Sequence, residues 1–267
     1  MEIQLWREIL DPYSLAVDEL VLKFNHMIKE YWNAGVYSPI ERVSGRVKKI
    51  SSILEKAQRK KIKLEDIEAK LDDIAGIRII CQFVEDIDKV VELIHKRSDM
   101  RVVEEKNYIK EQKESGYRSY HMIIEYCVQT MHGSKPLKVE IQIRTLAMNF
   151  WATIEHSLQY KYKTHMPEHL RKRLLKAAEA VVILDEEMAS VRSEIMDAQN
   201  SFRKKADIVS DILTNIQNLY KIANKKEIVK IQDEFFQLYE KDDVEALERF
   251  SKQLDIISEN HRAQSLK

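Results

Sequence analysis

A basic segment between residues 42 and 63 has the composition of a phosphate-binding site. It carries nine Lys and Arg residues and a single acid, Glu55. Side chains alternate along a strand, and positions i, i+4 and i+7 share one face of a helix. A strand and the helix after it would therefore aim five polar side chains at one place, namely Arg46, Lys48, Ser52, Lys56 and Arg59. Such a cluster suits a polyphosphate, but a solvated basic surface explains the charges equally well.

Two acidic residues beside β-branched runs are candidates for a metal site. Asp73 precedes the strand-like run AGIRII, and Glu140 lies in KVEIQIR, where polar and apolar residues alternate. Two carboxylates on neighbouring strands, opposite a polyphosphate, would hold Mg²⁺, which takes one or two carboxylates together with phosphate oxygens. The alternation by itself favours simple exposure of Glu140, because half-exposed strands show the same pattern.

The segment KESGYRSYH, residues 113–121, is polar and aromatic and leads into a predicted strand. Gly116 permits a tight turn, and Tyr117 offers a flat face on which a base can stack. Lys113 and His121 can reach phosphate oxygens. These features suit a base and a phosphate group. A structural tyrosine at the start of a strand is the alternative, and the residue types leave both open.

The elements that must position these residues follow a βαβ-then-hairpin order. β-branched runs predict strands at 43–50, 73–83, 101–104, 118–126 and 138–144. Apolar residues at helical spacing predict helices over 11–33 and 86–97. Ser51 and Ser52 are candidate caps of a helix that runs to about Lys61, and HGSKP (132–136) predicts a turn. The fold class is therefore α/β, a mixed sheet of about five strands wrapped by helices.

From Leu146 onward the sequence is helical, and no Gly or Pro follows Pro167. An apolar seam with spacings of four and three runs through Ala177, Val181, Leu184, Met188, Val191, Ile195, Ala198 and Phe202. This apolar seam must be buried somewhere, either by another subunit or by residues 203–267 folding back. We expect one domain over 1–202 and a helical C-terminal extension of unknown role over 203–267.

The composition excludes several classes of protein. The 267 residues carry 44 Lys and Arg against 44 Asp and Glu, which argues against a general nucleic-acid coat protein. No apolar run approaches the roughly 18–20 residues that span a bilayer, and the N-terminus does not resemble a signal peptide. Cys81 and Cys127 are the only cysteines, so neither a disulfide scaffold nor a cysteine zinc site is expected. These features predict a cytoplasmic location and no membrane partner.

Four motifs together resemble the successive motifs of the RelA/SpoT-type (p)ppGpp synthetase domain. In chain order they are SGRVKKISSILEKAQRK, DDIAGIRIICQF, ESGYRSYH and VEIQIRTLAMNFWATIEHSLQYKY. The match is closest to the small alarmone synthetases of the RelQ type and covers about residues 1–200. It implies a nucleotidyltransferase-like mixed sheet wrapped by helices, in agreement with the pattern of elements.

The resemblance also implies roles for individual residues. Arg46 and Arg78 would flank the adenine of ATP, whose phosphates would be held by Lys48, Ser52, Lys56 and Arg59. Asp73 would bind Mg²⁺, and Glu140 would complete the metal site and act as base on the acceptor 3′-hydroxyl. Tyr117 would stack on the guanine of GDP or GTP. The remaining contacts to this acceptor would come from Lys113, His121, Gln142 and Asn149.

The implied reaction is transfer of the ATP β,γ-pyrophosphate to the 3′-OH of GDP or GTP. Its products are AMP and (p)ppGpp, the signal of the stringent response. No His is followed by Asp and no His-rich cluster is present, so the hydrolase half of larger relatives is missing. The resemblance further implies a homo-oligomer, a tetramer. An alarmone or an RNA is a candidate allosteric partner, with Lys23 and Arg42 in the region that product-activated relatives use.

Two other functions remain as alternatives at this point. A nucleotidyltransferase with a similar sheet would release pyrophosphate instead of AMP. A non-catalytic helical interaction protein would account for the apolar seam and the long helical tail, but it would leave Asp73 and Glu140 without a role.

Overall fold

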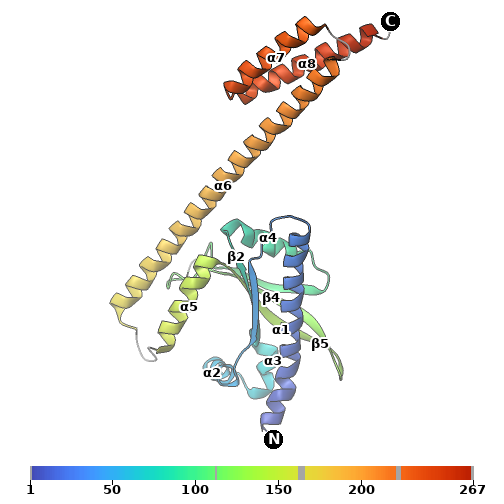
Figure 1. Ribbon diagram of the computed structural model, residues 1–267. Helices are drawn as coiled ribbons and strands as arrows, with labels where there is room; N and C mark the ends of the chain where they lie inside the picture. Colours follow the sequence, from blue (N-terminus) through green and yellow to red (C-terminus); the bar gives the residue numbers. More distant parts are fainter. Residues whose placement is uncertain (1, 112, 162–165, 221–223, 266–267) are drawn as a thin grey trace. The chain divides into compact units, whose positions relative to one another are not determined.

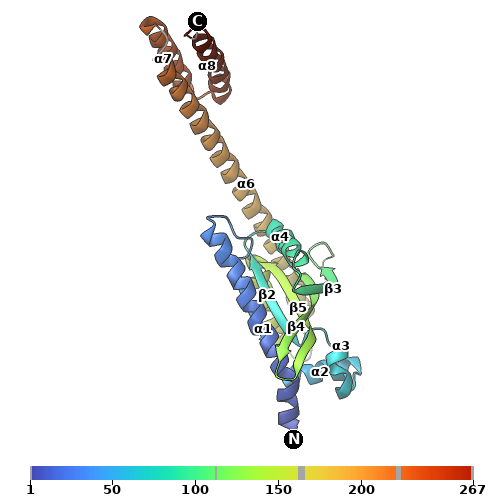
Figure 2. The same ribbon diagram turned by 90° about the vertical axis from the view of Figure 1, so that its right-hand side faces the viewer.

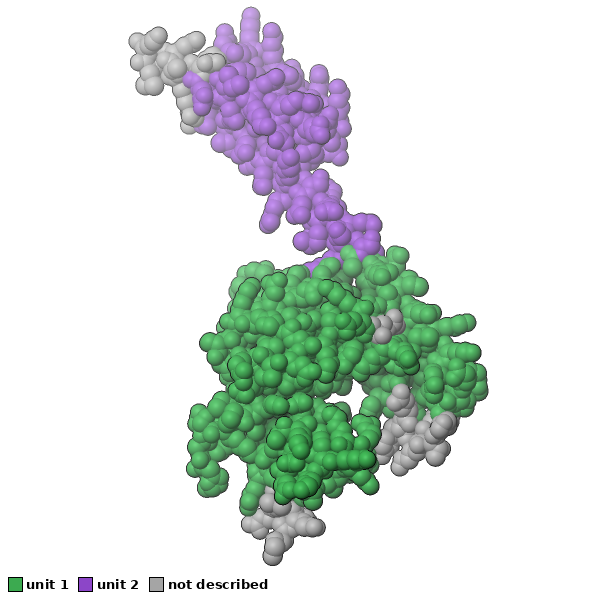
Figure 3. Space-filling view, turned by 180° about the vertical axis from the view of Figure 1, so that it is seen from behind, with its two compact units in different colours: residues 1–189 green, residues 190–267 purple. Residues whose placement is uncertain are grey.

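The computed structural model describes residues 2–111, 113–161, 166–220 and 224–265 (Figure 1). The chain divides into two compact units, residues 1–189 and 190–267, which Figure 3 distinguishes by colour. Each unit has its own hydrophobic core, and each is described here by itself. None of the described helices has the length and hydropathy needed to cross a membrane.

The first unit is built on one five-stranded mixed sheet. Its strands are β1 (Arg42–Val47), β2 (Ala75–Cys81), β3 (Met100–Asn107), β4 (Tyr120–Thr130) and β5 (Gly133–Thr145). They lie in the order β1-β2-β5-β4-β3, in which only the β2–β5 pair is parallel. The fold class predicted from the sequence is confirmed, and the strand boundaries shift by a few residues.

The turn between β4 and β5 is shorter than HGSKP suggests. β4 ends at Thr130, and β5 begins at Gly133, whose φ of 104° is the conformation that glycine adopts most easily. Pro136 therefore lies inside β5, paired with Cys127 of β4. It is tolerated there because β2 pairs with β5 only from Val139 onward, which leaves the other side of Pro136 without a ladder partner.

Two helices share the core on the apolar face of the sheet. They are α1 (Glu2–Asn33), which runs along the strands in Figure 2, and α4 (Val84–His95). Every second residue of β5, from Leu137 to Ile143, is buried in this core. Gly45 allows the close approach of α1, because a Cβ at that position would lie 2.6 Å from Val17 Cγ1. The polar residues between the buried ones therefore face the opposite side of the sheet.

Two expectations about helix starts are wrong. α1 begins well before residue 11 and continues through Pro12, because Trp6 and Leu10 pack against the core and offset the hydrogen bond that proline loses. α2 (Ile50–Lys60) has Lys49 at its N-cap, without a side-chain hydrogen bond, so Ser51 and Ser52 lie inside the first turn and do not cap it. The short η1 (Leu64–Asp66) and α3 (Ile67–Lys70) lead from α2 to β2.

β5 passes directly into α5 (Leu146–Lys161), and α6 (Glu168–Leu219) follows. Thr145 Oγ1 accepts a hydrogen bond from Met148 N at 3.0 Å and donates one to the buried Asp185 at 2.9 Å. Trp151 and Ala152 of α5 pack against Ala178 of α6 in a small apolar cluster. These contacts fix the start of α5 at the end of the central strand.

The second unit is a small helical bundle. The end of α6 packs with α7 (Lys225–Glu240) and α8 (Val244–Ser265). Its core includes the fully buried Ile212, Leu219, Leu247 and Leu254. Asn224 caps α7 by accepting a hydrogen bond from Lys226 N. The C-terminal helices are therefore folded around a core of their own, in which the apolar residues at helical spacing are buried.

The apolar seam predicted from the sequence lies along α6 and is largely exposed. Leu184, Met188, Val191 and Ile195 are about half exposed, and Phe202 is 75% exposed. Within the second unit, α7 and α8 pack against the part of α6 from Ile208 to Leu219, beyond the seam. The seam residues of that unit are therefore not covered by its own helices.

Candidate active site

The strand register aligns the candidate site residues in two neighbouring rows on the polar face of the sheet. In the first row Arg46 of β1 pairs with Gly76 of β2, and Gly76 pairs with Glu140 of β5. In the second row Arg78 pairs with Gln142, which pairs with His121 of β4. Directly paired residues project from the same face of a sheet. Residues from four segments of the sequence thus meet on one surface.

Two pockets open on this face and share the same two acids. The larger, of about 310 Å³, is lined by Arg46, Lys48, Asp73, Gly76, Arg78, Glu140, Gln142 and His156, with Ser44, Gly45, Ile74 and Ile77. The smaller, of about 140 Å³, is lined by Lys56, Lys60, Asp73, Tyr108, His121 and Glu140, with Asp72, Glu104, Glu105, Lys106 and Ile123. Asp73 and Glu140 belong to both linings, so they stand where the two pockets meet.

Asp73 is held by two lysines through one of its oxygens. Lys48 Nζ and Lys56 Nζ donate to Asp73 Oδ2 at 2.6 and 2.5 Å. Burial alone would raise the pKa of this carboxyl, but the two ammonium groups lower it below its ordinary value. The other oxygen, Oδ1, is buried and has no hydrogen-bond partner among the described residues. An ionised carboxylate with one unused oxygen beside Glu140 has the donor set that Mg²⁺ takes.

The described residues contain no group of three or more His, Cys, Asp or Glu side chains that would hold a metal without further ligands. A divalent cation between Asp73 and Glu140 would therefore depend on oxygens from outside the protein. Phosphate oxygens and waters normally complete the coordination of Mg²⁺ in nucleotide sites. The two acids thus fit a metal that arrives with a nucleotide.

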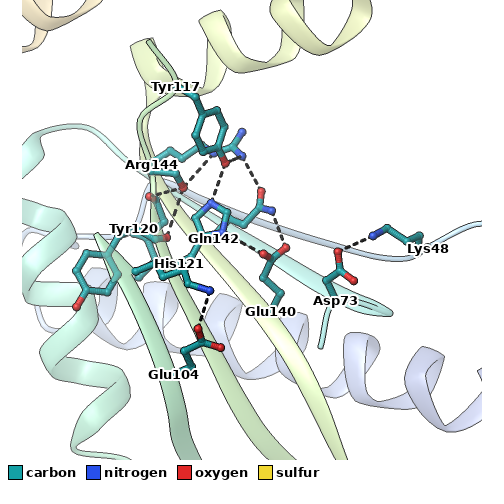
Figure 4. Close-up of polar contacts among 12 residues, drawn as sticks. Lys48, Asp73, Glu104, Tyr117, Tyr120, His121, Glu140, Gln142 and Arg144 are labelled. Atoms are coloured by element: carbon teal, nitrogen blue, oxygen red, sulfur yellow. Dashed lines mark hydrogen bonds and ion pairs between the residues drawn. The ribbon is translucent and has the colours of Figure 1, made fainter. Parts of the chain in front are cut away.

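Glu140 belongs to a closed ring of five hydrogen-bonded side chains (Figure 4). His121 Nδ1 lies 3.0 Å from Glu140 Oε1, and Gln142 Nε2 donates to Glu140 Oε2 at 2.7 Å. Tyr117 Oη lies 2.8 Å from His121 Nε2. Arg144 closes the ring, because its Nη2 donates to Tyr117 Oη at 2.5 Å and to Gln142 Oε1 at 2.7 Å. The orientation of Glu140 is therefore fixed from both sides.

The ring also sets the charge state of Glu140. Burial would raise the pKa of this carboxyl, but the His121 ring and the Gln142 amide hold it below its ordinary value. Burial raises the pKa of Tyr117 despite the guanidinium of Arg144 beside it. Glu140 is thus an ionised, oriented carboxylate next to a neutral phenol, and it can accept a proton from a hydroxyl group brought to its free lone pairs.

The loop before β4 places a cation between two aromatic rings. Lys113 Nζ lies 4.1 Å from the ring centre of Tyr108 and 5.0 Å from that of Tyr117. The two rings meet edge to face, with their centres 6.1 Å apart. Gly116 has a φ of 84°, which the tight turn requires. Tyr117 thus contacts both Lys113 and His121, while the predicted contacts of these residues with a nucleotide stay a prediction.

Five predicted nucleotide contacts lie outside both pocket linings, namely Ser52, Arg59, Lys113, Tyr117 and Asn149. Ser52 is half-buried on α2, and Arg59 is exposed near the end of that helix. Asn149 lies in the first turn of α5, with its buried Oδ1 lacking a hydrogen-bond partner within the described part of the chain. Of the four residues predicted to hold the ATP phosphates, Lys48 and Lys56 line a pocket and Ser52 and Arg59 do not. The nucleotide contacts of all the predicted site residues remain predictions.

Three residues at the site were not identified from the sequence. Arg144, the last residue of the alternating run KVEIQIR, was given no role, and it is 4% exposed. Tyr108 lies before the 113–121 motif in the sequence, and the turn after it brings its ring against that of Tyr117. His156 reaches the larger pocket from α5. The sequence feature that could have identified His156 is its position in the helix that directly follows the strand of Glu140.

Lys23 of α1, one of the two residues in the region predicted for an allosteric ligand, already binds side chains of the protein itself. Lys23 Nζ donates to Asp99 Oδ2 at 2.8 Å and to Tyr126 Oη at 2.7 Å. Arg42 is exposed at the start of β1. An anion at this place would have to compete with Asp99 for Lys23.

Comparison with known proteins places the chain in a family. The RelA_SpoT model, a region found in RelA/SpoT proteins, matches residues 45–165. The GTP pyrophosphokinase YjbM of Bacillus subtilis is 53% identical over 205 residues, which cover 77% of this chain and 97% of that protein. YwaC of the same organism, also named a GTP pyrophosphokinase, is 41% identical, with coverages of 71% and 91%.

Solved structures agree with these relatives. The B. subtilis small alarmone synthetase 1 bound to its product pppGpp matches with a TM-score of 0.70 and 54% identity, over 72% of this chain and 98% of that one. A GTP pyrophosphokinase family protein from Streptococcus pneumoniae matches with a TM-score of 0.70 and 52% identity, over 73% and 96%. The chain therefore belongs to the RelA/SpoT family and, within it, to the small alarmone synthetases.

Proposed function

We propose that this protein is a GTP diphosphokinase that transfers the β,γ-pyrophosphate of ATP to the 3′-OH of GDP or GTP. The products are AMP and ppGpp or pppGpp. The observation that carries the proposal is the pair of pockets that meet at Asp73 and Glu140. A transfer between two nucleotides needs one pocket for the donor, one for the acceptor, and the reacting atoms between them.

The larger pocket suits the donor, ATP. Arg46 and Arg78 line it from adjacent strands, where their planar guanidinium groups can stack on both faces of adenine. Lys48 and Lys56 sit beside Asp73, close to where the transferred phosphates would lie. Ser52 and Arg59 would contact phosphates from α2. Bound phosphates would take over part of the hydrogen bonding that the two lysines now give to Asp73.

Asp73 and Glu140 would hold Mg²⁺ together with the phosphates of ATP. The unused Oδ1 of Asp73 and the ionised state of both carboxyls support this assignment. The metal would neutralise charge on the phosphates during transfer. Lys48 and Lys56 add positive charge on the same side of the site, which favours the leaving AMP.

The acceptor would approach Glu140 from the side of His121, which lines the smaller pocket. Tyr117 would stack on guanine, and Lys113, His121, Gln142 and Asn149 would contact the rest of the nucleotide. Of these, Gln142 lines the larger pocket, and Tyr117, Lys113 and Asn149 lie outside both linings. Glu140 would take the proton of the 3′-hydroxyl as that oxygen attacks the β-phosphorus of ATP. The orientation that His121 and Gln142 impose on Glu140 supports this role, because a general base must be aimed at the proton that it removes.

The test is a product analysis with labelled ATP, Mg²⁺ and GDP. The expected products are AMP and ppGpp, with no turnover of added ppGpp to GDP and pyrophosphate. Release of pyrophosphate without AMP would indicate a nucleotidyltransferase instead. No turnover with any guanine nucleotide would indicate a non-catalytic interaction protein. The same assay on Glu140→Gln tests the proposed base. Its matched control is Glu125→Gln, because Glu125 is a carboxylate of β4 that pairs with Arg101 and lies outside both pocket linings.

We also propose a homo-oligomer, a tetramer, in which α6 supplies much of the contact up to Phe202. The exposure of the apolar seam supports it, because a stripe of this length is normally buried against another helix. We assign residues 1–202 to the synthetase domain and residues 203–267 to an added helical extension. A cytoplasmic location agrees with the two free cysteines. An alarmone or an RNA remains a candidate effector.

A further inference from the structure

The helix α6 is attached to the first unit along one of its faces. Leu174 O accepts a hydrogen bond from Trp151 Nε1 of α5 at 3.0 Å, and Ala178 is buried in the small cluster that contains Trp151. Val181 packs against the same cluster, and Asp185 follows one turn later. Residues at these spacings of four, three and four lie on the same face of a helix. The attached face of α6 therefore combines apolar side chains with one carboxyl.

Asp185 is the last buried residue of α6 in the first unit. It is 6% exposed, and no residue from 186 to 207, a described stretch of the helix, is buried. Its Oδ2 accepts a hydrogen bond at 2.9 Å from Oγ1 of Thr145, which is fully buried. Burial of a carboxyl costs free energy that burial of an apolar side chain does not. Packing alone would be served better by an apolar residue, so the contact with Thr145 points to a role in positioning.

The surroundings of Asp185 include the loop before β4. Burial raises the pKa of Asp185, while the Thr145 hydroxyl and the positive charge of Arg118 act in the opposite direction. Arg118 directly follows Tyr117 in the sequence and donates through Nη2 to Ile109 O at 3.3 Å. Asp185 thus interacts with groups at the end of β5 and in the loop that carries Tyr117.

Thr145 joins the central strand to α5. It is the last residue of β5, and its Oγ1 accepts a hydrogen bond from Met148 N at 3.0 Å, as the hydroxyl of a helix N-cap does. A threonine hydroxyl has one hydrogen and two lone pairs. The hydrogen points to Asp185, which leaves a lone pair for Met148 N. Asp185 therefore holds the hydroxyl in the orientation that caps α5.

The first two turns of α5 carry or support elements of the proposed acceptor site. Asn149 lies in the first turn, and its buried Oδ1 has no hydrogen-bond partner among the described residues. The ring of Tyr117 packs against the cluster around Trp151. The arginines of the larger pocket, Arg46 and Arg78, lie on β1 and β2 instead. A shift of the start of α5 therefore disturbs the acceptor side of the site more than the donor side.

We propose that Asp185 is a positioning residue for the acceptor nucleotide, because its hydrogen bond to Thr145 holds the start of α5 and the surface on which Tyr117 rests. The proposal rests on the proposed function, in which Tyr117 and Asn149 contact GDP or GTP. Loss of a helix cap corresponds to a factor of about 2–30 in an equilibrium constant, and we expect the affinity for GDP to fall within that range. The affinity for an ATP analogue should change little, because His156, the residue of α5 that lines the larger pocket, lies about three turns beyond the cap.

The contact can be tested without any nucleotide. Hydrogen–deuterium exchange of the full chain, followed by mass spectrometry of peptides that cover residues 145–152, reports on the first turns of α5. We expect faster exchange of this segment in Asp185→Leu and in Thr145→Val, with unchanged exchange in β1 and β2. Glu179→Leu is the control, because Glu179 is an exposed acid of the same helix. Wild-type exchange in both Asp185→Leu and Thr145→Val would overturn the proposal.

Conservative variants and a double variant separate positioning from packing. Asp185→Asn keeps an acceptor and Thr145→Ser keeps the hydroxyl, so both should retain the GDP affinity of the wild-type protein. Thr145→Val combined with Asp185→Leu replaces both partners by apolar groups, a change that is often nearly neutral for stability. In this double variant the melting temperature should recover relative to the single variants, while the affinity for GDP stays low. Recovery of both together would refute the positioning role, because it would make the contact merely structural.

Titration calorimetry with GDP and with a non-hydrolysable ATP analogue distinguishes this proposal from the proposed function. If Tyr117→Ala binds GDP as the wild-type protein does, the acceptor assignment fails, while exchange in α5 still decides whether Asp185 holds the helix. If Tyr117→Ala weakens GDP but Asp185→Leu and Thr145→Val bind it normally, the acceptor assignment stands and the positioning role is wrong. The expected result is a loss of GDP affinity in all three variants, with little change for the ATP analogue. Equal losses for both nucleotides in Asp185→Leu would contradict a role on the acceptor side.

Discussion

Gly76 lies directly beside Glu140 in the parallel β2–β5 pair and directly beside Arg46 in the antiparallel β1–β2 pair. A Cβ at position 76 would have only ordinary contacts, 3.9 Å from the carbonyl oxygen of Glu140 and 4.0 Å from that of Arg46. The backbone therefore does not require glycine at position 76. The missing side chain instead leaves open the space of the larger pocket between Arg46 and Glu140.

Gly76→Val should consequently fill the larger pocket without unfolding the protein. We expect a rise in the KM for ATP and little change for GDP, because Gly76 lines only the larger of the two pockets. Steady-state kinetics with each nucleotide varied in turn measures the difference. An equal rise in both constants would show that the two pockets are not separate sites.

Gly45→Ala is the contrasting variant on the other face of the sheet. A Cβ there would lie 2.6 Å from Val17 Cγ1 and 2.9 Å from both Ile77 Cδ1 and Val21 Cγ2. Overpacking of this kind typically costs about 1–3 kcal/mol of unfolding free energy. Thermal denaturation should show a lower midpoint for Gly45→Ala than for Gly76→Val. The reverse order would contradict the assignment of the two faces.

Glu140→Gln should abolish synthesis and leave the fold intact. Loss of a general base alone typically costs about 10²–10⁴-fold, and loss of a metal ligand adds to it. Turnover of labelled ATP and a melting curve of the same sample give both answers. Near-native turnover in this variant, with Glu125→Gln as the control, would show that Glu140 is not the base.

Tyr117→Ala should weaken the guanine nucleotide far more than ATP. Stacking of an aromatic ring on a base contributes about 1–3 kcal/mol in single-strand binding proteins, or roughly 5–150-fold in affinity. Tyr117→Phe keeps the ring and should retain that affinity. Titration calorimetry with GDP and with a non-hydrolysable ATP analogue makes the comparison. Similar losses for both nucleotides in Tyr117→Ala would make the residue structural.

The stability of the first unit should depend on Asp99 in a defined pH range. Hydrogen bonds from Arg97 and Lys23 lower the pKa of Asp99 to about 2. A carboxyl whose pKa is depressed on folding stabilises the native state above its unfolded pKa of about 3.9 and loses this contribution as the pH falls toward 2. The difference in unfolding free energy between the wild type and Asp99→Asn should therefore shrink below about pH 4. A constant difference from pH 7 to 2.5 would contradict the ion pairs.

The apolar seam predicts the oligomeric state. Light scattering should give a multiple of the 31.6 kDa chain mass, and Val191→Glu together with Ile195→Glu should reduce it. Ile256→Glu is the matched control, because Ile256 on α8 is 60% exposed, more than either Val191 or Ile195, but lies outside the seam. A monomeric wild-type protein, or dissociation by the control variant, would rule out the seam as the contact.

The alternation of polar and apolar residues was sufficient to predict the faces of the central strand. Leu137, Val139, Ile141 and Ile143 are buried, so Glu140 had to face the other side, where the sequence placed it. The register with β2 and β4 was not predictable, because it depends on pairings between strands far apart in the chain. For the same reason the closed ring through Arg144 could not be derived, although each of its members except Arg144 was proposed as a site residue.

Helix starts were less predictable than strands. Ser51 and Ser52 have the side chains of N-caps, but burial of Ile53 and Ala57 fixes the phase of α2, and the helix begins at Ile50. Pro12 is unfavourable inside a helix, yet packing of Trp6 against the core extends α1 past it. In both places tertiary contacts outweigh a local preference worth about 1–3 kcal/mol.

The central parallel pair joins strands that are far apart in the chain, which we expect to delay the formation of the site during folding. β4 and β5 are joined by a two-residue turn and can pair early, whereas β2 is separated from β5 by α4, β3 and β4. Contacts between distant segments form late, because the entropy of loop closure must be overcome first. We therefore expect Asp73 and the arginine-bearing strands to reach Glu140 late in folding. A partly folded chain would hold the acceptor loop and the base together but would lack the donor pocket, so it could not consume ATP.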